Sequence, residues 1–297
     1  MSLSMKLTLS RRHFAAASAA AALSLLLSAC DLSDAADGGN RVRIGVSGGD
    51  PEWDVVAEEA KKEGIDVKIV TFDDYQLPNR ALADGDIELN AFQHLAFLSQ
   101  FNARNGTDIV PVTSTSVAPM GLYSLKHKKV DELPDGARVA IPNDPSNQGR
   151  ALLVLEQAKL IEVKDKAGIY ATPEDIEANP RHLKITPVDA QQTPRTLKDT
   201  DASIINDGVA VLAGHKPSEA IFRDDPKSAT ARPYVNVIAA RAKDKDSETV
   251  RKIVKIYRSP KVQEAVAKSA NGAKYVLDIP AAELQRELDR LQKQGRG

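Results

Sequence analysis

The segment from Pro142 to Arg150 carries the residues with the clearest potential for ligand chemistry. It reads Pro-Asn-Asp-Pro-Ser-Asn-Gln-Gly-Arg and lies between an expected strand, 138–141, and an expected helix that begins at Ser146. Free backbone N–H groups at a helix start attract a carboxylate, and the guanidinium of Arg150 can hold one through two parallel hydrogen bonds. A solvated arginine near a helix start fits the same spacing, so the sequence leaves both interpretations open.

Three further polar residues stand at or within expected strands. His94 follows a strand, the usual place for cleft residues in α/β folds, although a helix-start histidine with a purely structural hydrogen bond is the alternative. Asn206 ends the expected strand 202–205, and Asn236 lies within the expected strand 235–239. A buried amide needs hydrogen-bond partners, which the amino and carboxylate groups of a ligand can supply. An edge or turn position explains each asparagine equally well.

Composition argues against several other kinds of chemistry. The 297 residues carry a net charge of −1, and the chain has no basic run, which disfavours nucleic-acid binding through phosphates. The single cysteine excludes an intrachain disulfide framework and any multi-cysteine metal centre. The H-E-x-x-H zinc motif and the G-x-S-x-G nucleophile elbow do not occur. We therefore expect no metal site, no cofactor, no nucleic-acid partner and no enzymatic activity.

Strands and helices that alternate along the chain must position these residues. Apolar spacing predicts helices over 77–83, 95–105, 146–160 and 281–292, and strands over 42–46, 65–71, 87–92, 109–112, 138–141, 183–188, 202–205 and 235–239. This alternation indicates mainly parallel α/β sheets. We expect an α/β fold of two lobes with a ligand cleft between them. Lobe I would contain residues 41–122 plus 234–297, and lobe II residues 123–233.

The first 29 residues have the order of a secretory signal peptide. A basic end precedes residues 14–29, an uncharged run rich in Ala and Leu that is too short for a comfortable membrane span. The run ends Leu-Ser-Ala before Cys30, which resembles a bacterial lipoprotein signal and implies that Cys30 is lipidated and begins the mature protein. A buried structural cysteine is the alternative. Residues 10–14 resemble a twin-arginine export signal, but an ordinary basic end fits them equally well.

The residues after the lipoprotein signal predict how the body is attached. Residues 30–40 are small, polar and glycine-containing, which is typical of a flexible tether. Asp31 resembles an inner-membrane retention signal of Gram-negative lipoproteins. We therefore expect a protein of the cell envelope that is anchored through Cys30 to a membrane and faces the periplasm, with the inner membrane preferred.

Four stretches of the body together resemble the NlpA lipoprotein family, the methionine-binding substrate-binding proteins of ABC importers. They are residues 71–79, 85–94, 139–150 and 233–237. The Phe-Gln-His triplet in the second and the Pro-Asn-Asp-Pro sequence in the third are specific in combination. The stretches follow the family order, so the resemblance covers the body from about Val42 to the C-terminus.

This resemblance implies a fold like that of the periplasmic binding proteins, with two α/β lobes that close on an amino acid. It implies that Arg150 grips the α-carboxylate and that Asn206 and Asn236 hold the amino and carboxylate groups. The pocket for the ligand's side chain would be lined by Tyr75, Phe92 and His94. The implied partners are methionine or a related amino acid, an ABC permease and its ATPase, and we expect a monomer.

The chain departs from the family pattern at several positions. Ala118 stands where the family often has Glu or Tyr, Gly208 and Val209 replace an Asn-Tyr pair, and 95–97 replaces Lys-Pro-Tyr. These changes predict a thinner aromatic wall and a broadened or shifted preference among amino acids. Asp207 adds a candidate partner for an ammonium group.

Two other functions of the same cleft remain open from the sequence. A lipid-anchored hydrolase would need a nucleophile with a base in reach. A metal-ion receptor would need several histidine or carboxylate ligands, whereas His94 is the one histidine that the sequence places in the cleft.

Overall fold

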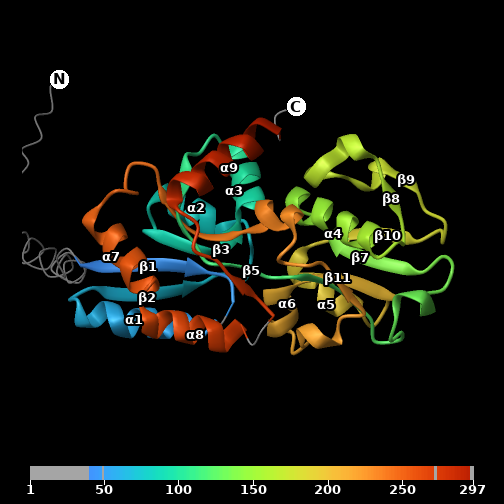
Figure 1. The fold of residues 1–297 in the computed structure, drawn as a ribbon, viewed down its shortest axis with the longest axis horizontal. Coiled ribbons are helices and arrows are strands. Elements are labelled where there is room, and N and C mark those ends of the chain that lie inside the picture. Colours follow the sequence, from blue (N-terminus) through green and yellow to red (C-terminus); the bar gives the residue numbers. More distant parts are fainter. Residues whose placement is uncertain (1–39, 49, 271–272, 295–297) are drawn as a thin grey trace, which may run out of the picture. The chain divides into compact units, whose positions relative to one another are not determined.

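Two five-stranded sheets with helices on their faces organise the body of the chain (Figure 1). The computed structural model describes residues 40–48, 50–270 and 273–294. The expected signal peptide, Cys30 and the tether up to residue 39 lie outside these ranges. The two sheets confirm the α/β fold with two lobes.

The strands of the first sheet come from both halves of the chain. In spatial order they are β2 (Asp66–Thr71), β1 (Arg41–Val46), β3 (Leu89–His94), β13 (Asn236–Arg241) and β4 (Ile109–Ser114). The second sheet runs β10 (Lys184–Val188), β7 (Arg138–Pro142), β11 (Ala202–Asn206), β6 (Met120–Tyr123) and β12 (Phe222–Arg223). Two short ribbons pair β14 (Tyr275–Val276) with β5 (Ser116–Val117) and β8 (Glu162–Val163) with β9 (Ile176–Ala178).

Parallel strand pairs occur in both sheets, as expected from the sequence, but each sheet also contains a strand that runs against its neighbours. β13 runs antiparallel to both β3 and β4, and β6 is antiparallel to β11 and β12. Parallel neighbours need a crossover connection, usually a helix. β13 instead enters the first sheet directly from the second lobe, so it can run against its neighbours. As a result, the first residue of β13 lies beside the last residue of β3.

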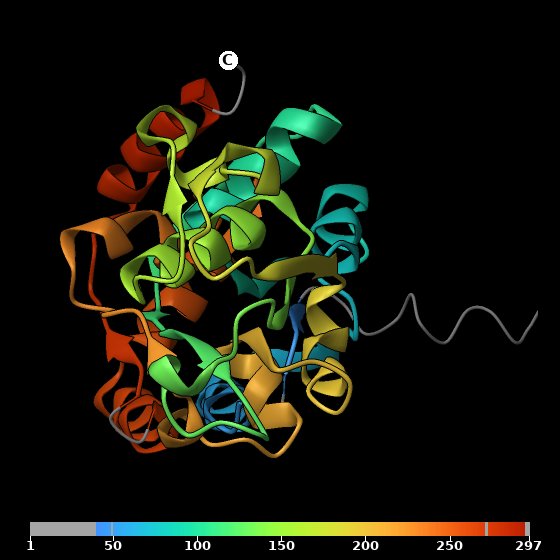
Figure 2. The ribbon, with the colours of Figure 1, turned by 90° about the vertical axis from the view of Figure 1, so that its right-hand side faces the viewer.

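The chain passes between the two sheets through residues 115–119 and again through residues 224–235, within the ranges that the structure describes. β6 already belongs to the second sheet at Met120, ahead of the boundary expected after residue 122. The lobe boundaries themselves stay a prediction. Figure 2 views the ribbon from the side of the second sheet.

Helices cover each sheet on both faces. On the first sheet, α1 (Glu52–Lys62), α7 (Glu248–Tyr257) and α8 (Pro260–Ala270) share one apolar core, and α2 (Leu77–Asp84), α3 (Leu95–Asn105) and α9 (Ala281–Gln294) share another. On the second sheet, α4 (Pro145–Gln157) lies on the face opposite α5 (Thr193–Thr196) and α6 (Asp207–Leu212) (Figure 1). No helix in the described ranges combines the length and the apolar character needed to cross a membrane.

Gly149 allows α4 to approach the backbone of the segment 165–170. A Cβ at this position would collide with the carbonyl oxygen of Ile169. We expect Gly149→Ala to lower the free energy of unfolding by about 1–3 kcal/mol, the usual effect of overpacking. Gly208→Ala is the matched control, because its Cβ would meet no heavy atom within 4 Å. Urea unfolding measures both, and equal effects of the two substitutions would contradict this account of Gly149.

Candidate functional site

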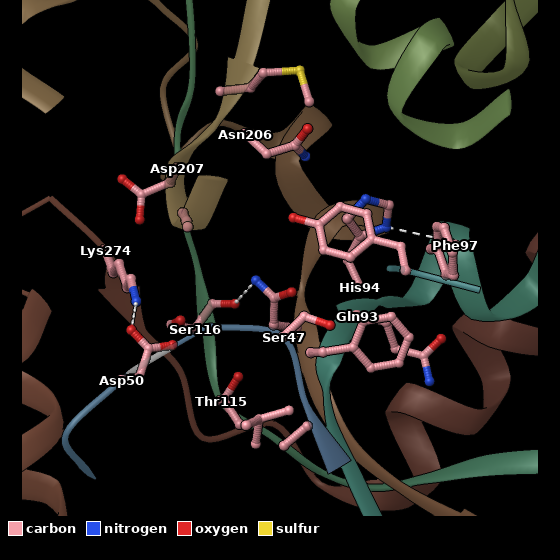
Figure 3. Close-up of a pocket in the computed structure, with 18 of the residues that line it drawn as sticks. Ser47, Asp50, Gln93, His94, Phe97, Thr115, Ser116, Asn206, Asp207 and Lys274 are labelled. Carbon is pink, nitrogen blue, oxygen red and sulfur yellow. Dashed lines mark hydrogen bonds and ion pairs between the residues drawn. The ribbon is translucent and has the colours of Figure 1, made fainter. Parts of the chain in front are cut away.

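One cavity of about 120 Å³ contains all of the ligand-binding residues expected from the sequence. Residues of both lobes line it. The expected residues are Tyr75, Phe92, His94, Arg150, Asn206 and Asn236. Figure 3 shows Asn206 and Asp207 on one side of this cavity and His94 and Phe97 on the other. The structure therefore brings together residues that are distant in the sequence.

Strand ends explain this convergence. His94 is the last residue of β3, and Asn206 is the last residue of β11. Asn236 is the first residue of β13, and it pairs in register with His94 because β13 runs antiparallel to β3. Each of these strands thus places a polar side chain at the strand end that borders the cavity. Ligand sites in α/β folds usually lie at such strand ends.

His94 caps a helix and lines the cavity at the same time. Its Nδ1 accepts a hydrogen bond of 3.1 Å from the backbone N–H of Phe97, and its Nε2 lies 3.2 Å from Oδ1 of Asn147. Nε2 therefore carries the proton and donates it. Burial, and then the positive charge of Arg150, lowers the pKa of His94 to about 3. The imidazole is consequently neutral at physiological pH, and His94 both caps α3 and lines the cavity.

Asn147 links the two lobes and determines what Asn206 can bind. The Nδ2 of Asn147 donates to the carboxylate of Asp144, so its Oδ1 is left as the acceptor for His94. The Nδ2 of Asn206 donates to the same oxygen over 2.8 Å. Asn206 therefore presents its own Oδ1 to a ligand, and this buried oxygen has no partner among the described residues. The sequence did not single out Asn147 as a site residue.

Arg150 is buried at 5% exposure, which overturns the interpretation of a solvated helix-start arginine. Its Nε donates to Oδ2 of Asp224 over 2.9 Å, and its Nη2 donates to the carbonyl oxygen of Ala118 over 2.7 Å. The guanidinium carbon lies 4.5 Å from the centroid of the Tyr234 ring. These contacts hold the guanidinium in one orientation in the cavity wall, where it can meet a carboxylate.

Asp144 caps the start of α4, which begins at Pro145, one residue before the start expected at Ser146. Oδ1 of Asp144 accepts from the backbone N–H of Asn147 over 3.0 Å. Burial raises the pKa of Asp144, although its hydrogen bonds oppose that shift. Because this carboxylate already satisfies the helix start, Arg150 is the better candidate for binding a ligand carboxylate.

Three aromatic rings form one wall of the cavity. The ring centroids of Tyr75 and Phe92 are 6.0 Å apart, and Phe97 lies edge-on to both at 6.1 and 5.8 Å. The thinner wall expected from the sequence change at 95–97 is therefore not found, because Phe97 supplies an aromatic ring there. Such rings are suitable neighbours for a thioether.

Buried amide side chains form a cluster next to this wall, and one of them, Gln93, also lines the cavity. Asn79 and Gln93 exchange two hydrogen bonds of 2.6 Å. Asn90 donates to Oδ1 of Asn79 over 2.8 Å and accepts from Nε2 of Gln93 over 2.9 Å. These bonds hold α2 against β3, and thereby stabilise the position of the aromatic rings.

The opposite end of the cavity is charged, which the sequence did not predict. Nζ of Lys274 lies 2.9 Å from Oδ1 of Asp50. Burial disfavours the charge of Lys274, but the carboxylates of Asp50 and Asp207 prevail and raise its pKa. Burial raises the pKa of Glu52, which also lines the cavity.

The positions that depart from the family pattern divide into two groups. Ala118 and Gly208 line the cavity, so they can affect ligand preference. Val209 instead packs in a small core with Tyr123 and Ile205. The effect expected from position 209 on the aromatic surface of the pocket therefore has no support in the geometry.

The arrangement is suited to binding a small zwitterion. A cation, neutral hydrogen-bond acceptors and apolar rings line the same cavity. Both ring nitrogens of His94 are engaged by Phe97 and Asn147, so neither activates a hydroxyl. Within the described ranges, no three histidine, cysteine or carboxylate residues are grouped so that they could hold a metal ion.

Comparison with known proteins shows what this chain is similar to. The sequence profile of the NlpA lipoprotein family matches residues 42–277. The D-methionine-binding lipoprotein MetQ of Salmonella typhimurium is 44% identical over 239 residues, which cover 78% of this chain and 87% of that protein. The family match spans both sheets and all six expected site residues.

Two solved structures share the fold. A nutrient binding protein from Burkholderia cenocepacia, bound to methionine, is 44% identical with a TM-score of 0.75, and the match covers 79% of this chain and 99% of that one. The substrate binding protein of a methionine transporter from Streptococcus pneumoniae is 32% identical with a TM-score of 0.76, and that match covers 80% and 95% of the two chains.

Proposed function

This chain belongs to the NlpA lipoprotein family, and on that basis we propose that it is a substrate-binding lipoprotein that captures methionine or a close relative for an ABC importer. It binds and releases the ligand as a monomer, without making or breaking a bond. The permease and ATPase of the importer are its protein partners. The methionine ligand of the Burkholderia cenocepacia protein supports this ligand class.

The grouping of six separately expected residues around one cavity is the observation that carries the proposal. Arg150 binds the α-carboxylate, since it is the guanidinium in the cavity wall and its orientation is held by Asp224 and Ala118. Asn206 presents a buried acceptor, its Oδ1, that has no partner among the described residues, and it therefore binds the amino group. Asn236 donates to the carbonyl oxygen of Ser116 and completes the polar side of the cavity.

The apolar part of the ligand lies against the aromatic wall in this proposal. Tyr75, Phe92 and Phe97 surround it, and His94 borders it as a neutral group. Sulfur–aromatic contacts of about 0.3–1.5 kcal/mol each favour a thioether there. Lobe I (41–122 plus 234–297) and lobe II (123–233) close on the ligand.

Mass spectrometry of the ligand released from gently purified protein tests the function. A competition panel of L-methionine, D-methionine, other apolar amino acids and methionine-containing dipeptides then defines the preferred class. A thermal shift with metal ions but with no amino acid would instead favour the metal-receptor alternative, because a ligand that binds the native state raises its apparent stability. Hydrolysis of any of the dipeptides would favour the hydrolase alternative.

The anchor is proposed at Cys30, in the cell envelope and facing the periplasm, with the inner membrane preferred because of Asp31. We expect Cys30→Ser to remain unprocessed or to become soluble, because the thiol is the site of lipid attachment. Fractionation with and without detergent, and the mass of the mature chain, measure this. A processed Cys30→Ser protein that still requires detergent would contradict the proposal, and Ser28→Ala serves as the control that keeps the thiol.

A further inference from the structure

The first residue of α6 is an aspartate whose carboxylate lies in the cavity wall. Asp207 is buried at 5% exposure and lines the cavity. Its Oδ1 is buried and has no hydrogen-bond partner among residues 40–48, 50–270 and 273–294. A buried polar group without a partner is costly, so this oxygen requires a donor that the described part of the chain does not supply.

The charges of Lys274, Arg150 and Arg223 all act on the Asp207 carboxylate, and the first two of these cations are bonded to other carboxylates. Lys274 is paired with Asp50 at 2.9 Å, and Arg150 is paired with Asp224 at 2.9 Å. Burial raises the pKa of Asp207, although the charges of Lys274 and Arg150 oppose that shift. The charges of Lys274 and Arg150 therefore act on Asp207, but neither side chain forms a hydrogen bond with it.

A second acceptor stands directly beside it. The Oδ1 of Asn206 is also buried and unpartnered within the described ranges, because its Nδ2 is used by Asn147. The two oxygens come from consecutive residues and line the same cavity. An ammonium group carries up to three N–H donors and a positive charge, so it satisfies both acceptors and the carboxylate's charge together.

Gly208 leaves room next to these acceptors. It lines the cavity, and a Cβ added there would meet no heavy atom within 4 Å. The space admits an ammonium that belongs either to a free amino acid or to a ligand extended at its amino end. The chemistry at Asp207 is the same in both cases.

We propose that Asp207 binds the ammonium group of the ligand and, with the space at Gly208, determines which ammonium-bearing ligands this chain accepts. This inference rests on the proposed function and adds a specificity-determining residue to it. Asn206 supplies the neutral acceptor and Asp207 the charge. A competing explanation is that Asp207 pairs with Lys274 when the cleft closes.

Calorimetry on the wild type, Asp207→Asn and Lys274→Met distinguishes these explanations. The ligands are L-methionine, 4-(methylthio)butanoic acid, which lacks the ammonium, and a dipeptide with methionine at its carboxyl end. We expect Asp207→Asn to weaken the ammonium ligand that the wild type prefers by about 10- to 100-fold, the range for a charged hydrogen bond. Binding of 4-(methylthio)butanoic acid should change by less than about twofold.

The affinities of the wild type for L-methionine and for the dipeptide show which ammonium group Asp207 binds. Tighter binding of L-methionine identifies the α-ammonium, whereas tighter binding of the dipeptide identifies an extended amino end; either supports the role of Asp207. In the second case, Gly208→Ala should weaken the dipeptide more than it weakens L-methionine, because its Cβ occupies the extra space.

Two results would overturn the proposal. One is that Asp207→Asn weakens binding of the ligands with and without the ammonium equally. Lys274→Met should have the same effect if Asp207 and Lys274 pair when the cleft closes. The other is unchanged affinity for every ligand. A wild type that binds none of the three would overturn the proposed function as well, so the two failures are distinguishable. The melting temperature of each variant verifies that it is folded.

Discussion

Arg150→Ala is expected to lower the affinity for an amino acid by about 2–5 kcal/mol of binding free energy, the usual loss when one partner of a buried charge pair is removed. This corresponds to a factor of roughly 30 to several thousand. The guanidinium is buried in the cavity wall, and Asp224 and Ala118 hold its orientation. Its loss leaves the ligand carboxylate without a cation in an enclosed site. Titration calorimetry measures the change.

Two controls separate lost recognition from a damaged fold. Arg195→Ala removes an exposed arginine far along the chain and should leave the affinity unchanged. Methionine amide, tested on the wild type, lacks the carboxylate and should also bind far more weakly. Equal affinities of the amide and the free acid would show that the carboxylate is held elsewhere, as would unchanged affinity in Arg150→Ala.

Asn147→Ala is expected to reduce both stability and binding, because one side chain serves both lobes. It removes the acceptor shared by His94 and Asn206 and the donor to Asp144. Each buried polar group left unpaired costs about 1–3 kcal/mol, so we expect the free energy of unfolding to fall by about 2–4 kcal/mol. The amide of Asn206 would also be free to turn over, and its oxygen would no longer be reserved for the ligand.

Gln148→Ala is the matched control for Asn147→Ala, since it changes the neighbouring residue in the same helix turn, where the side chain is only partly buried. We expect its stability and affinity to stay within about 0.5 kcal/mol of the wild type, as for most substitutions away from such networks. Thermal unfolding and calorimetry measure both variants. If Asn147→Ala behaved like Gln148→Ala, the link between the lobes through Asn147 would be wrong.

Local signals made much of the fold predictable. The expected helix over 95–105 coincides with α3, and expected strands coincide closely with β1, β7 and β11. The direction of β13 was not predictable. The residues of a strand do not indicate from which end of the sheet the chain enters, and this determines whether the strand is parallel or antiparallel to its neighbours. β6 and the short ribbons were missed for a related reason, since they are too short to show a periodic pattern.

The residues that line the cavity were predictable in kind but not in their hydrogen-bond and packing partners. Arginine, histidine and asparagine at strand and helix ends indicated a polar cleft, and the family resemblance implied their roles. The sequence could not show that Asp144 takes the helix start or that Phe97 joins Tyr75 and Phe92. Contacts of this kind depend on side-chain directions across elements far apart in the chain.

The sequence by itself determined the family and the alternation of strands and helices, and it supplied the predictions of a lipoprotein signal and of six site residues. The alternation follows from residue type and spacing along one chain, whereas the family and the roles of the site residues follow from the resemblance. Only the tertiary structure decided which polar atoms are already satisfied. The Nδ2 of Asn206 donates to Asn147 whereas its Oδ1 has no partner, Lys274 pairs with Asp50, and Oδ1 of Asp207 has no donor among the described residues. Hydrogen bonding is short-ranged and directional, so it is decided only when the two lobes place these atoms within 3 Å of one another or fail to do so.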